Sequence, residues 1–317
     1  MKTPLRYPGG KSRAVKHILP HIPEGVERVC SPFFGGGSIE LALANRGVQV
    51  FGYDKMKQLV WFWMALCGDN NQLADEVQKL REEYDIRSGE NVTGCSKDSF
   101  HQYREDLKTD SFMFSYERAA KYYAINRASF SGATFSGGWS ERASYARFTD
   151  SSIKRLRDFK AKNFRVDYAD FEDAINYHPR AFLYLDPPYM LNGSQNSLYG
   201  IDGNLHSSFD HERLHGLLTN RTGWLMSYND CDTIREMYDG YEIIEAEWSY
   251  SMKNVVSPEI TAKRKELEQY KEMFSKSILN APDTLKQICL NIINNLEDKI
   301  SNLKKPQATS SEILIKG

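Results

Sequence analysis

The sequence predicts an α/β fold built on an open, mostly parallel sheet. A short strand over about residues 27–31 runs into the glycine loop Gly35-Gly36-Gly37 and then a helix, and a second strand covers 48–54. Strands and helices alternate again from residue 164 to 248. Within that part, an apolar strand stops at Leu185, because the two prolines that follow lack an N–H and cannot continue a ladder.

The segment that follows this strand is Asp186-Pro187-Pro188-Tyr189, and it should project from the carboxyl edge of the sheet. Open α/β sheets bind their ligands at that edge. The carboxylate of Asp186 and the carbonyl of Pro187 can accept hydrogen bonds from an exocyclic amino group, and Tyr189 offers a flat face on which a base can stack. A plainer interpretation, a strand end followed by a proline turn, is open on these four residues alone.

Composition limits the classes of protein that need to be considered. The 317 residues, 41% of them apolar, suffice for one large α/β domain with a smaller module, or for two domains. The net charge is −1, but residues 118–165 carry eleven Lys and Arg against three acids. That excess is a candidate phosphate-facing surface, and its plainer interpretation is a solvated helix face.

The cysteines and the apolar runs indicate where the protein works. The five cysteines are scattered and show no metal-ligand or disulfide spacing, which predicts reduced thiols, no metal ion and a cytoplasmic protein. The N-terminus is polar, and no apolar run approaches the roughly 18 residues of a membrane span. We therefore expect neither secretion nor a membrane association.

Two nucleotide-binding motifs are nearly matched and fail on one residue each. Gly10-Lys11-Ser12 matches the end of a P-loop, but Leu5 stands where that motif needs its first glycine. Gly35-x-Gly37 lacks the third glycine of a dinucleotide fingerprint, because Glu40 occupies that position. Asp54, at the end of the second strand, can accept hydrogen bonds from the ribose of an adenosyl or a nicotinamide cofactor. A nicotinamide dehydrogenase is therefore a weak alternative.

Taken in order, the motifs resemble those of Dam-type DNA adenine-N6 methyltransferases. An aromatic residue with Pro-Gly-Gly-Lys, the loop Pro-Phe-Phe-Gly-Gly-Gly-Ser, the acid at 54, an insert and Asp-Pro-Pro-Tyr follow one another over most of residues 1–250, and the last seven residues match as well. The resemblance implies a Rossmann-like methyltransferase sheet that binds S-adenosylmethionine, with an inserted, mainly helical target-recognition domain. It places the catalytic domain at 1–54, 162–258 and 306–317, the recognition domain with an Arg- and aromatic-rich hairpin at 55–161, and a helical insertion at 259–305.

The resemblance also implies roles for individual residues. Asp186, Pro187 and Tyr189 are the catalytic residues. The cofactor-binding residues would be Tyr7, Lys11, Phe34, Gly35, Gly37, Ser38, Asp54, Asp170, Phe171 and Asp186. Lys11 would lie near the carboxylate end of the cofactor or near the active site, and for Phe171 plain core packing is an equal alternative. The expected DNA contacts are Asn126, Arg127, Arg142 and Arg147.

By this resemblance, the protein would methylate adenine N6 in double-stranded DNA after base flipping. Its partners would be DNA and a restriction endonuclease acting on the same site, and it would be associated with the nucleoid. Cytosine-N4 transfer shares the Asp-Pro-Pro-Tyr motif and stays open, as does a non-catalytic DNA-binding protein on the same scaffold. A cytosine-C5 enzyme is a competing class that the sequence disfavours, because its nucleophilic cysteine usually follows a proline and no proline here precedes a cysteine.

Overall fold

The structure is a computed structural model. It describes residues 2–86, 90–109, 113–160, 162–190, 200–201, 204–246 and 312–317, together with Leu267, Lys271 and Ile293. The chain divides into two compact units, Met1–Trp248 with Glu312–Gly317, and Ser249–Ser311. The first unit contains the sheet. The helical insertion expected at 259–305 lies outside the described residues, apart from those three single positions.

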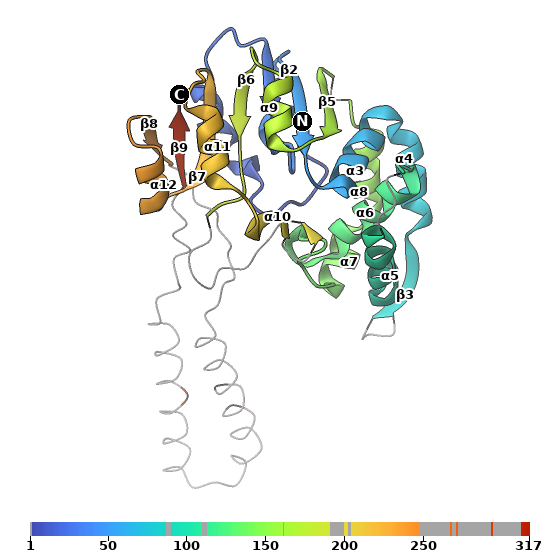
Figure 1. The fold of residues 1–317 in the computed structure, drawn as a ribbon. Helices are drawn as coiled ribbons and strands as arrows, with labels where there is room; N and C mark the ends of the chain where they lie inside the picture. Colours follow the sequence, from blue (N-terminus) through green and yellow to red (C-terminus); the bar gives the residue numbers. More distant parts are fainter. Residues whose placement is uncertain are drawn as a thin grey trace. The chain divides into compact units, whose positions relative to one another are not determined.

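A seven-stranded mixed sheet forms the centre of the first unit (Figure 1). Its strands are β1 (Arg28–Ser31), β2 (Gln49–Asp54), β5 (Phe164–Tyr168), β6 (Phe182–Leu185), β7 (Trp224–Asn229), β8 (Glu242–Glu245) and β9 (Glu312–Lys316). They lie in the order β5-β2-β1-β6-β7-β9-β8. The first five pair in parallel, whereas β9 runs antiparallel to both of its neighbours. The predicted α/β sheet is therefore confirmed. The strands expected at about 27–31 and 48–54 correspond to β1 and β2, and the strand expected to stop at Leu185 is β6.

The direction of chain progression reverses at β1. Strand β2 pairs with one side of β1, and β6 pairs with the other. At such a switch point the connections leave in opposite directions, and a crevice opens beyond the carboxyl ends of the two central strands. Strand β1 ends at Ser31 and β6 at Leu185, so the glycine loop and Asp186 both begin at this crevice.

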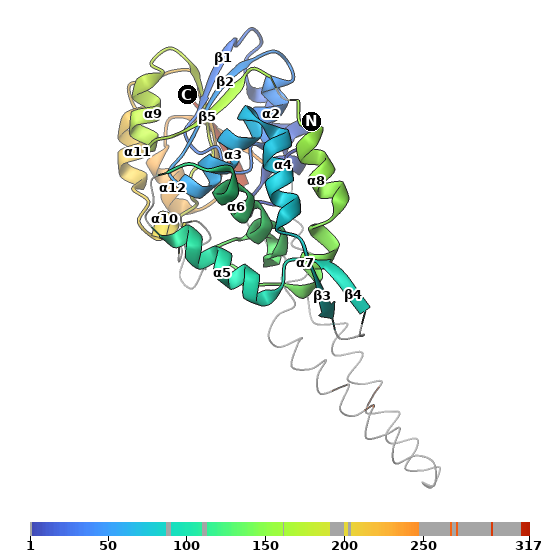
Figure 2. The same cartoon turned by 90° about the vertical axis from the view of Figure 1, so that its right-hand side faces the viewer.

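Helices cover both faces of the sheet. Helices α9 (Phe171–Tyr177), α11 (His211–Leu218) and α12 (Asp232–Met237) lie on one face, and α2 (Ser38–Ala44) and α3 (Lys57–Gly68) on the other (Figure 2). Every residue of β6 and β7 is buried, as expected for central strands that are covered on both sides. Four further short helices are η1 (Lys11–Arg13), α1 (Val15–Ile18), η2 (Leu19–His21) and α10 (Asn204–Ser207).

A group of helices occupies the chain between β2 and β5. After α3 come α4 (Asn70–Lys79), α5 (Lys97–Lys108), α6 (Tyr116–Ala128), α7 (Glu141–Arg147) and α8 (Asp150–Arg157). Helix α6 contacts α3, α4, α5 and α7, and most of its residues are buried. Because α3 also contacts β2 and β5, the group is continuous with the sheet. A separate recognition domain at 55–161 stays a prediction.

The sequence favours a β-hairpin or a long loop for the Arg- and aromatic-rich segment after α6, and the structure forms no hairpin there. It forms the short helix η3 (Phe130–Gly132), one isolated bridge between Ser129 and Trp139, and then α7. The reason is the cap at Ser140, whose side chain accepts a hydrogen bond from the N–H of Ala143 and starts a helix. An antiparallel pair lies earlier instead, β3 (Glu82–Ile86) with β4 (Glu90–Gly94). The sequence favours a charged amphipathic helix over 71–84, whereas α4 ends at Lys79 and β3 begins at Glu82.

No helix in the described part of the chain is both long enough and apolar enough to cross a membrane.

Candidate active site

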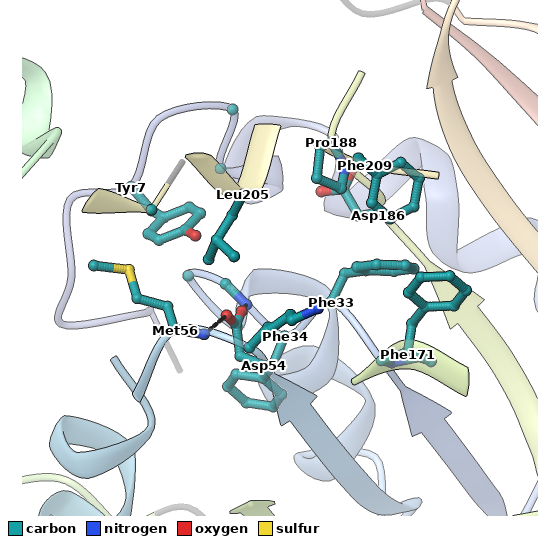
Figure 3. Close-up of a pocket in the computed structure, with 18 of the residues that line it drawn as sticks. Tyr7, Phe33, Phe34, Asp54, Met56, Phe171, Asp186, Pro188, Leu205 and Phe209 are labelled. Carbon is teal, nitrogen blue, oxygen red and sulfur yellow. Dashed lines mark hydrogen bonds between the residues drawn. The ribbon is translucent and has the colours of Figure 1, made fainter. Parts of the chain in front are cut away.

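A pocket lies at the crevice beyond β1 and β6 (Figure 3). Its walls come from residues 7–11, the loop after β1, the end of β2, the start of α9 and the segment around Asp186, with further residues between 200 and 213. All ten residues that the sequence assigned to the cofactor line this pocket: Tyr7, Lys11, Phe34, Gly35, Gly37, Ser38, Asp54, Asp170, Phe171 and Asp186. The fold thus brings them together, and their roles stay predictions.

The ring of Tyr7 covers the glycine loop after β1. A Cβ atom would lie 2.9 Å from Tyr7 Cε1 if it were added at Gly35, and 2.8 Å from Tyr7 Cβ if it were added at Gly36. Gly35 also has a positive φ of 48°, which a side chain disfavours. The indole N–H of Trp63 donates to the carbonyl of Gly35 at 3.0 Å and so helps to fix the loop. Only glycine therefore allows Tyr7 to approach the loop this closely.

Asp54 is oriented by the backbone around it. Its Oδ2 accepts from the N–H of Gly35 at 3.0 Å, and its Oδ1 accepts from the N–H of Met56 at 2.9 Å (Figure 3). Burial raises the pKa of this carboxyl group to about 6, and the backbone hydrogen bonds oppose the rise. A carboxylate offers about four acceptor positions, so Asp54 can also accept a hydroxyl from a ligand.

Phe33, Phe171 and Phe209 form an aromatic cluster in the pocket wall (Figure 3). Their ring centroids lie 5.4 to 5.7 Å apart. The rings are inclined to one another and present apolar surface against which an adenine ring can pack. The ring of Phe34 instead packs 5.1 Å from that of Trp63 and belongs to the core. Both residues line the pocket, but the ring of Phe33 belongs to the aromatic cluster of its wall, whereas the ring of Phe34 packs into the core.

Two donors hold the carboxylate of Asp186. The ammonium group of Lys11 lies 2.6 Å from Oδ1 and 2.8 Å from Oδ2, and the hydroxyl of Ser227 donates to Oδ1 at 3.0 Å. The side chain of Lys11 is only 4% exposed, and it also donates to the carbonyl of Gly9 at 3.2 Å. Charge-assisted bonds of this kind are short and strongly oriented. The pocket edge therefore presents one fixed carboxylate acceptor.

Tyr189 lies beside this pair rather than in the pocket lining. Its ring stacks on that of Tyr228 with centroids 5.9 Å apart, and the ammonium group of Lys11 lies 5.0 Å from its centroid. Its hydroxyl donates to Oε1 of Glu312 at 2.5 Å. Three contacts thus fix the plane of the ring. Asp186 and Pro188 line the pocket, whereas Pro187 between them is buried and does not.

Glu40 is a buried acid in the pocket wall, 3% exposed, in the first turn of α2. Its Oε1 accepts from the hydroxyl of Ser31 at 2.7 Å. Burial raises the pKa of Glu40 to about 7, the carboxylate of Asp186 adds to the rise, and Lys11 opposes it.

Asp170 and Arg213 add polar groups to the pocket wall near α9. Asp170 caps α9 by accepting from the N–H of Glu172 at 3.2 Å, and it pairs with the ammonium group of Lys55 at 2.7 Å. The guanidinium group of Arg213 lies 5.5 Å from the centroid of the Phe171 ring.

Two of the four expected DNA contacts are buried. Asn126 is fully buried, accepts from the N–H of Arg6 at 3.0 Å and donates to the carbonyl of Arg6 at 2.6 Å. Arg127 is 5% exposed and donates to the carbonyls of Arg147 and Pro4, at 2.8 and 3.4 Å. These side chains tie α6 to the N-terminal segment. Because both side chains are buried and bonded to the protein's own backbone, we do not propose them as DNA contacts.

Arg142 and Arg147 are exposed on α7. Tyr145 on the same helix is 41% exposed, and Phe130 before it is 69% exposed. A helix with exposed arginines and aromatic rings is compatible with DNA contact, and these two arginines stay predicted contacts.

Several residues of the site were missed from the sequence: Phe33, Glu40, Met56, Leu205, Phe209, Arg213, Ser227 and Glu312. Most lie outside any recognised motif. For Phe33 a signal was present, because neighbouring side chains in an extended segment point in opposite directions. If the ring of Phe34 enters the core, that of Phe33 must face away from it.

Comparisons with known proteins identify a matching family model and similar proteins. A family model described as "D12 class N6 adenine-specific DNA methyltransferase" matches residues 7–252. The chain is similar to the Type II methyltransferase M.CviBI of Paramecium bursaria Chlorella virus NC1A, with 23% identity over 271 residues, 80% of this chain and 92% of that protein. It is also similar to Modification methylase StsI of Streptococcus sanguinis, with 24% identity over 226 residues, 62% of this chain and 30% of that protein.

Proposed function

The chain belongs to the D12 class of N6 adenine-specific DNA methyltransferases, and we propose that it methylates adenine N6 within one short sequence of double-stranded DNA, using S-adenosylmethionine. The observation that carries this proposal is the position of Asp186. Its carboxylate is fixed by Lys11 and Ser227 at the edge of the pocket in which all ten predicted cofactor residues meet.

The chemistry of the pocket fits S-adenosylmethionine. Asp54 can accept from ribose hydroxyls, and the cluster of Phe33, Phe171 and Phe209 suits an adenine ring. The ring of Tyr7 over the glycine loop suits a positively charged sulfonium group. When bound, this cofactor supplies a methyl group on a sulfonium and leaves as S-adenosylhomocysteine.

Asp186 has the central part in the proposed chemistry. The amino group of adenine is a poor nucleophile, because its lone pair is delocalised into the ring. The carboxylate of Asp186 and the carbonyl of Pro187 would accept the two N6 hydrogens and direct the lone pair at the methyl carbon. The bound cofactor would supply the methyl group as its carbon–sulfur bond breaks and the nitrogen–carbon bond forms, and Asp186 would pass one N6 proton to water. Orientation supplies most of the rate enhancement in such a direct transfer.

Adenine inside a duplex is out of reach of Asp186, so the base must flip out, at a cost of a few kcal/mol. Stacking on the ring of Tyr189, worth about 1–3 kcal/mol per base, offsets much of this cost. Arg142 and Arg147 would hold the DNA backbone, since arginine side chains commonly contact phosphates.

Two further parts of the proposal rest on the relatives and the family. One relative is named a Type II methyltransferase and the other a Modification methylase, and these names support a restriction endonuclease that acts on the same DNA site. Because the family is adenine-specific, we do not propose cytosine-N4 transfer.

The test is incubation with labelled S-adenosylmethionine and unmethylated genomic DNA, followed by long-read mapping of modified bases. We expect N6-methyladenine in one short motif. The matched control is Asp186→Asn, which keeps the size of the side chain and loses its charge, and which should bind DNA without methylating it. N4-methylcytosine would contradict the assigned base. DNA binding without any label would favour a non-catalytic protein on this scaffold.

A further inference from the structure

Strand β9 places a buried acid at the catalytic edge of the sheet. Because β9 runs antiparallel to β7, its first residue, Glu312, pairs with Asn229, the last residue of β7. That end of the sheet is also where β6 stops before Asp186. Glu312 lies outside the residues that the family model matches.

A carboxylate at this position is costly for a purely structural strand. Glu312 is 2% exposed, while the next three residues, Ile313, Leu314 and Ile315, are apolar and fully buried. Burial of an ionised side chain costs free energy unless it is paired and hydrogen-bonded, and a well-packed apolar residue often stabilises a fold more. The side chain of Glu312 is therefore better explained by its partners than by the packing of the strand.

Two of those partners are residues of the site. Oε1 of Glu312 accepts from the hydroxyl of Tyr189 at 2.5 Å and lies 3.9 Å from the ammonium group of Lys11. The same ammonium group bonds both carboxylate oxygens of Asp186. Lys11 thus lies between two carboxylates, one at the pocket edge and one buried.

The strand partner of Glu312 holds the next residue of the chain. Asn229 accepts from the N–H of Met190 at 3.0 Å and donates to the carbonyl of Met190 at 3.2 Å. The ends of β9 and β7 therefore hold the two residues that follow Pro188. Glu312 binds the hydroxyl of Tyr189, and Asn229 binds the backbone of Met190.

We propose that Glu312 is a positioning residue for methyl transfer: it fixes the ring of Tyr189 for the flipped base and holds Lys11 against Asp186. This inference rests on the proposed function, because it concerns the step in which Tyr189 and Asp186 receive the base. Glu312 touches neither base nor cofactor in this proposal and acts only through Tyr189 and Lys11.

The kinetic test compares Glu312→Ala, Glu312→Gln and Tyr189→Phe on unmethylated genomic DNA. We expect Glu312→Ala to lower kcat about tenfold or more while KM for S-adenosylmethionine changes less than threefold. Glu312→Gln should stay within about threefold of the wild type, because its amide oxygen can accept from the Tyr189 hydroxyl. The double variant Glu312→Ala/Tyr189→Phe should have a kcat no lower than that of the slower single variant, since each substitution removes the same hydrogen bond between Tyr189 and Glu312. Lys316→Ala, at the other end of β9, is the control and should keep the wild-type rate.

A second measurement does not depend on activity. Nitration by tetranitromethane requires the phenolate, so a tyrosine that donates to a buried carboxylate reacts slowly. Peptide mass spectrometry should show Tyr189 nitrated at least fivefold faster in Glu312→Ala than in the wild type, with exposed Tyr168 and Tyr177 as unchanged internal references.

The outcomes are distinguishable. A wild type that methylates no DNA overturns the proposed function, and the nitration rates then decide whether Glu312 holds Tyr189. An unchanged nitration rate, a wild-type kcat in Glu312→Ala, or losses that multiply in the double variant would each overturn the role of Glu312.

Discussion

The ammonium group of Lys11 lies 2.6 and 2.8 Å from the two carboxylate oxygens of Asp186, although 175 positions separate the residues in the chain. Lys11 begins η1 close to the N-terminus, and Asp186 directly follows β6. The N-terminal segment is therefore an integral part of the candidate active site. Its position is maintained by Asn126 and Arg127, which bind the backbone of Pro4 and Arg6.

Removal of the Lys11 charge should leave the Asp186 carboxylate less well oriented. We expect Lys11→Met to lower kcat roughly 30-fold, equivalent to about 2 kcal/mol for a charge-assisted hydrogen bond. Steady-state methylation of genomic DNA measures the change. Lys16→Met, an exposed lysine five positions further along, is the matched control and should keep the wild-type kcat. Equal kcat values for the two variants would show that Lys11 does not orient Asp186.

Asn126→Ala should affect folding rather than DNA affinity. The substitution removes the hydrogen bonds of a fully buried amide to Arg6, and we expect the free energy of unfolding to fall by about 2–4 kcal/mol. Urea denaturation measures the loss. Arg142→Ala should instead weaken DNA binding and leave the free energy of unfolding within about 0.5 kcal/mol of the wild type. The slope of the logarithm of the DNA-binding constant against the logarithm of the salt concentration should fall by about 1, because one phosphate contact is lost. If Asn126→Ala were as stable as the wild type but bound DNA more weakly, Asn126 would be a DNA contact, as the resemblance implies.

Glu40 should make stability depend on pH. Its pKa is raised from 4.5 to about 7, so the folded state binds a proton more tightly than the unfolded state does. Its contribution to stability is present below about pH 4.5 and is lost as the pH rises through about 7. Glu40→Gln lacks this loss, so its stability relative to the wild type should increase between pH 5 and pH 8, by on the order of 3 kcal/mol at most. Urea denaturation of both proteins at the two pH values tests this, and a difference independent of pH would contradict it.

Phe33→Ala and Phe34→Ala should separate cofactor binding from core packing. The ring of Phe33 lies in the pocket cluster, so its loss should weaken S-adenosylmethionine binding about tenfold, near 1.4 kcal/mol, as measured by calorimetry. The ring of Phe34 is 2% exposed and packs against Trp63 and Phe164, so its loss should cost about 3–5 kcal/mol of stability. The reverse pattern would mean that Phe34 is the residue that faces the cofactor.

Much of the fold was predictable because its signals are local. Two prolines end β6 at Leu185 whatever lies around them, and apolar runs of strand length identify β1, β2, β6 and β7. The hairpin expected after α6 failed for an equally local reason. Gly137 and Gly138 are turn signals that favour a hairpin, whereas the side-chain cap at Ser140 starts α7 in the structure.

By itself, the sequence determined the α/β class, the strand ends and the motifs that converge at one edge, because backbone restrictions and hydrophobic periodicity act over a few residues. Only the tertiary structure decided which ring of Phe33 and Phe34 faces the pocket, that Asn126 and Arg127 are interior, and that Glu312 reaches Tyr189. Asn126 is 120 positions from Arg6, and Glu312 is 123 from Tyr189. Contacts at such separations depend on how complete elements pack, and no local pattern specifies them.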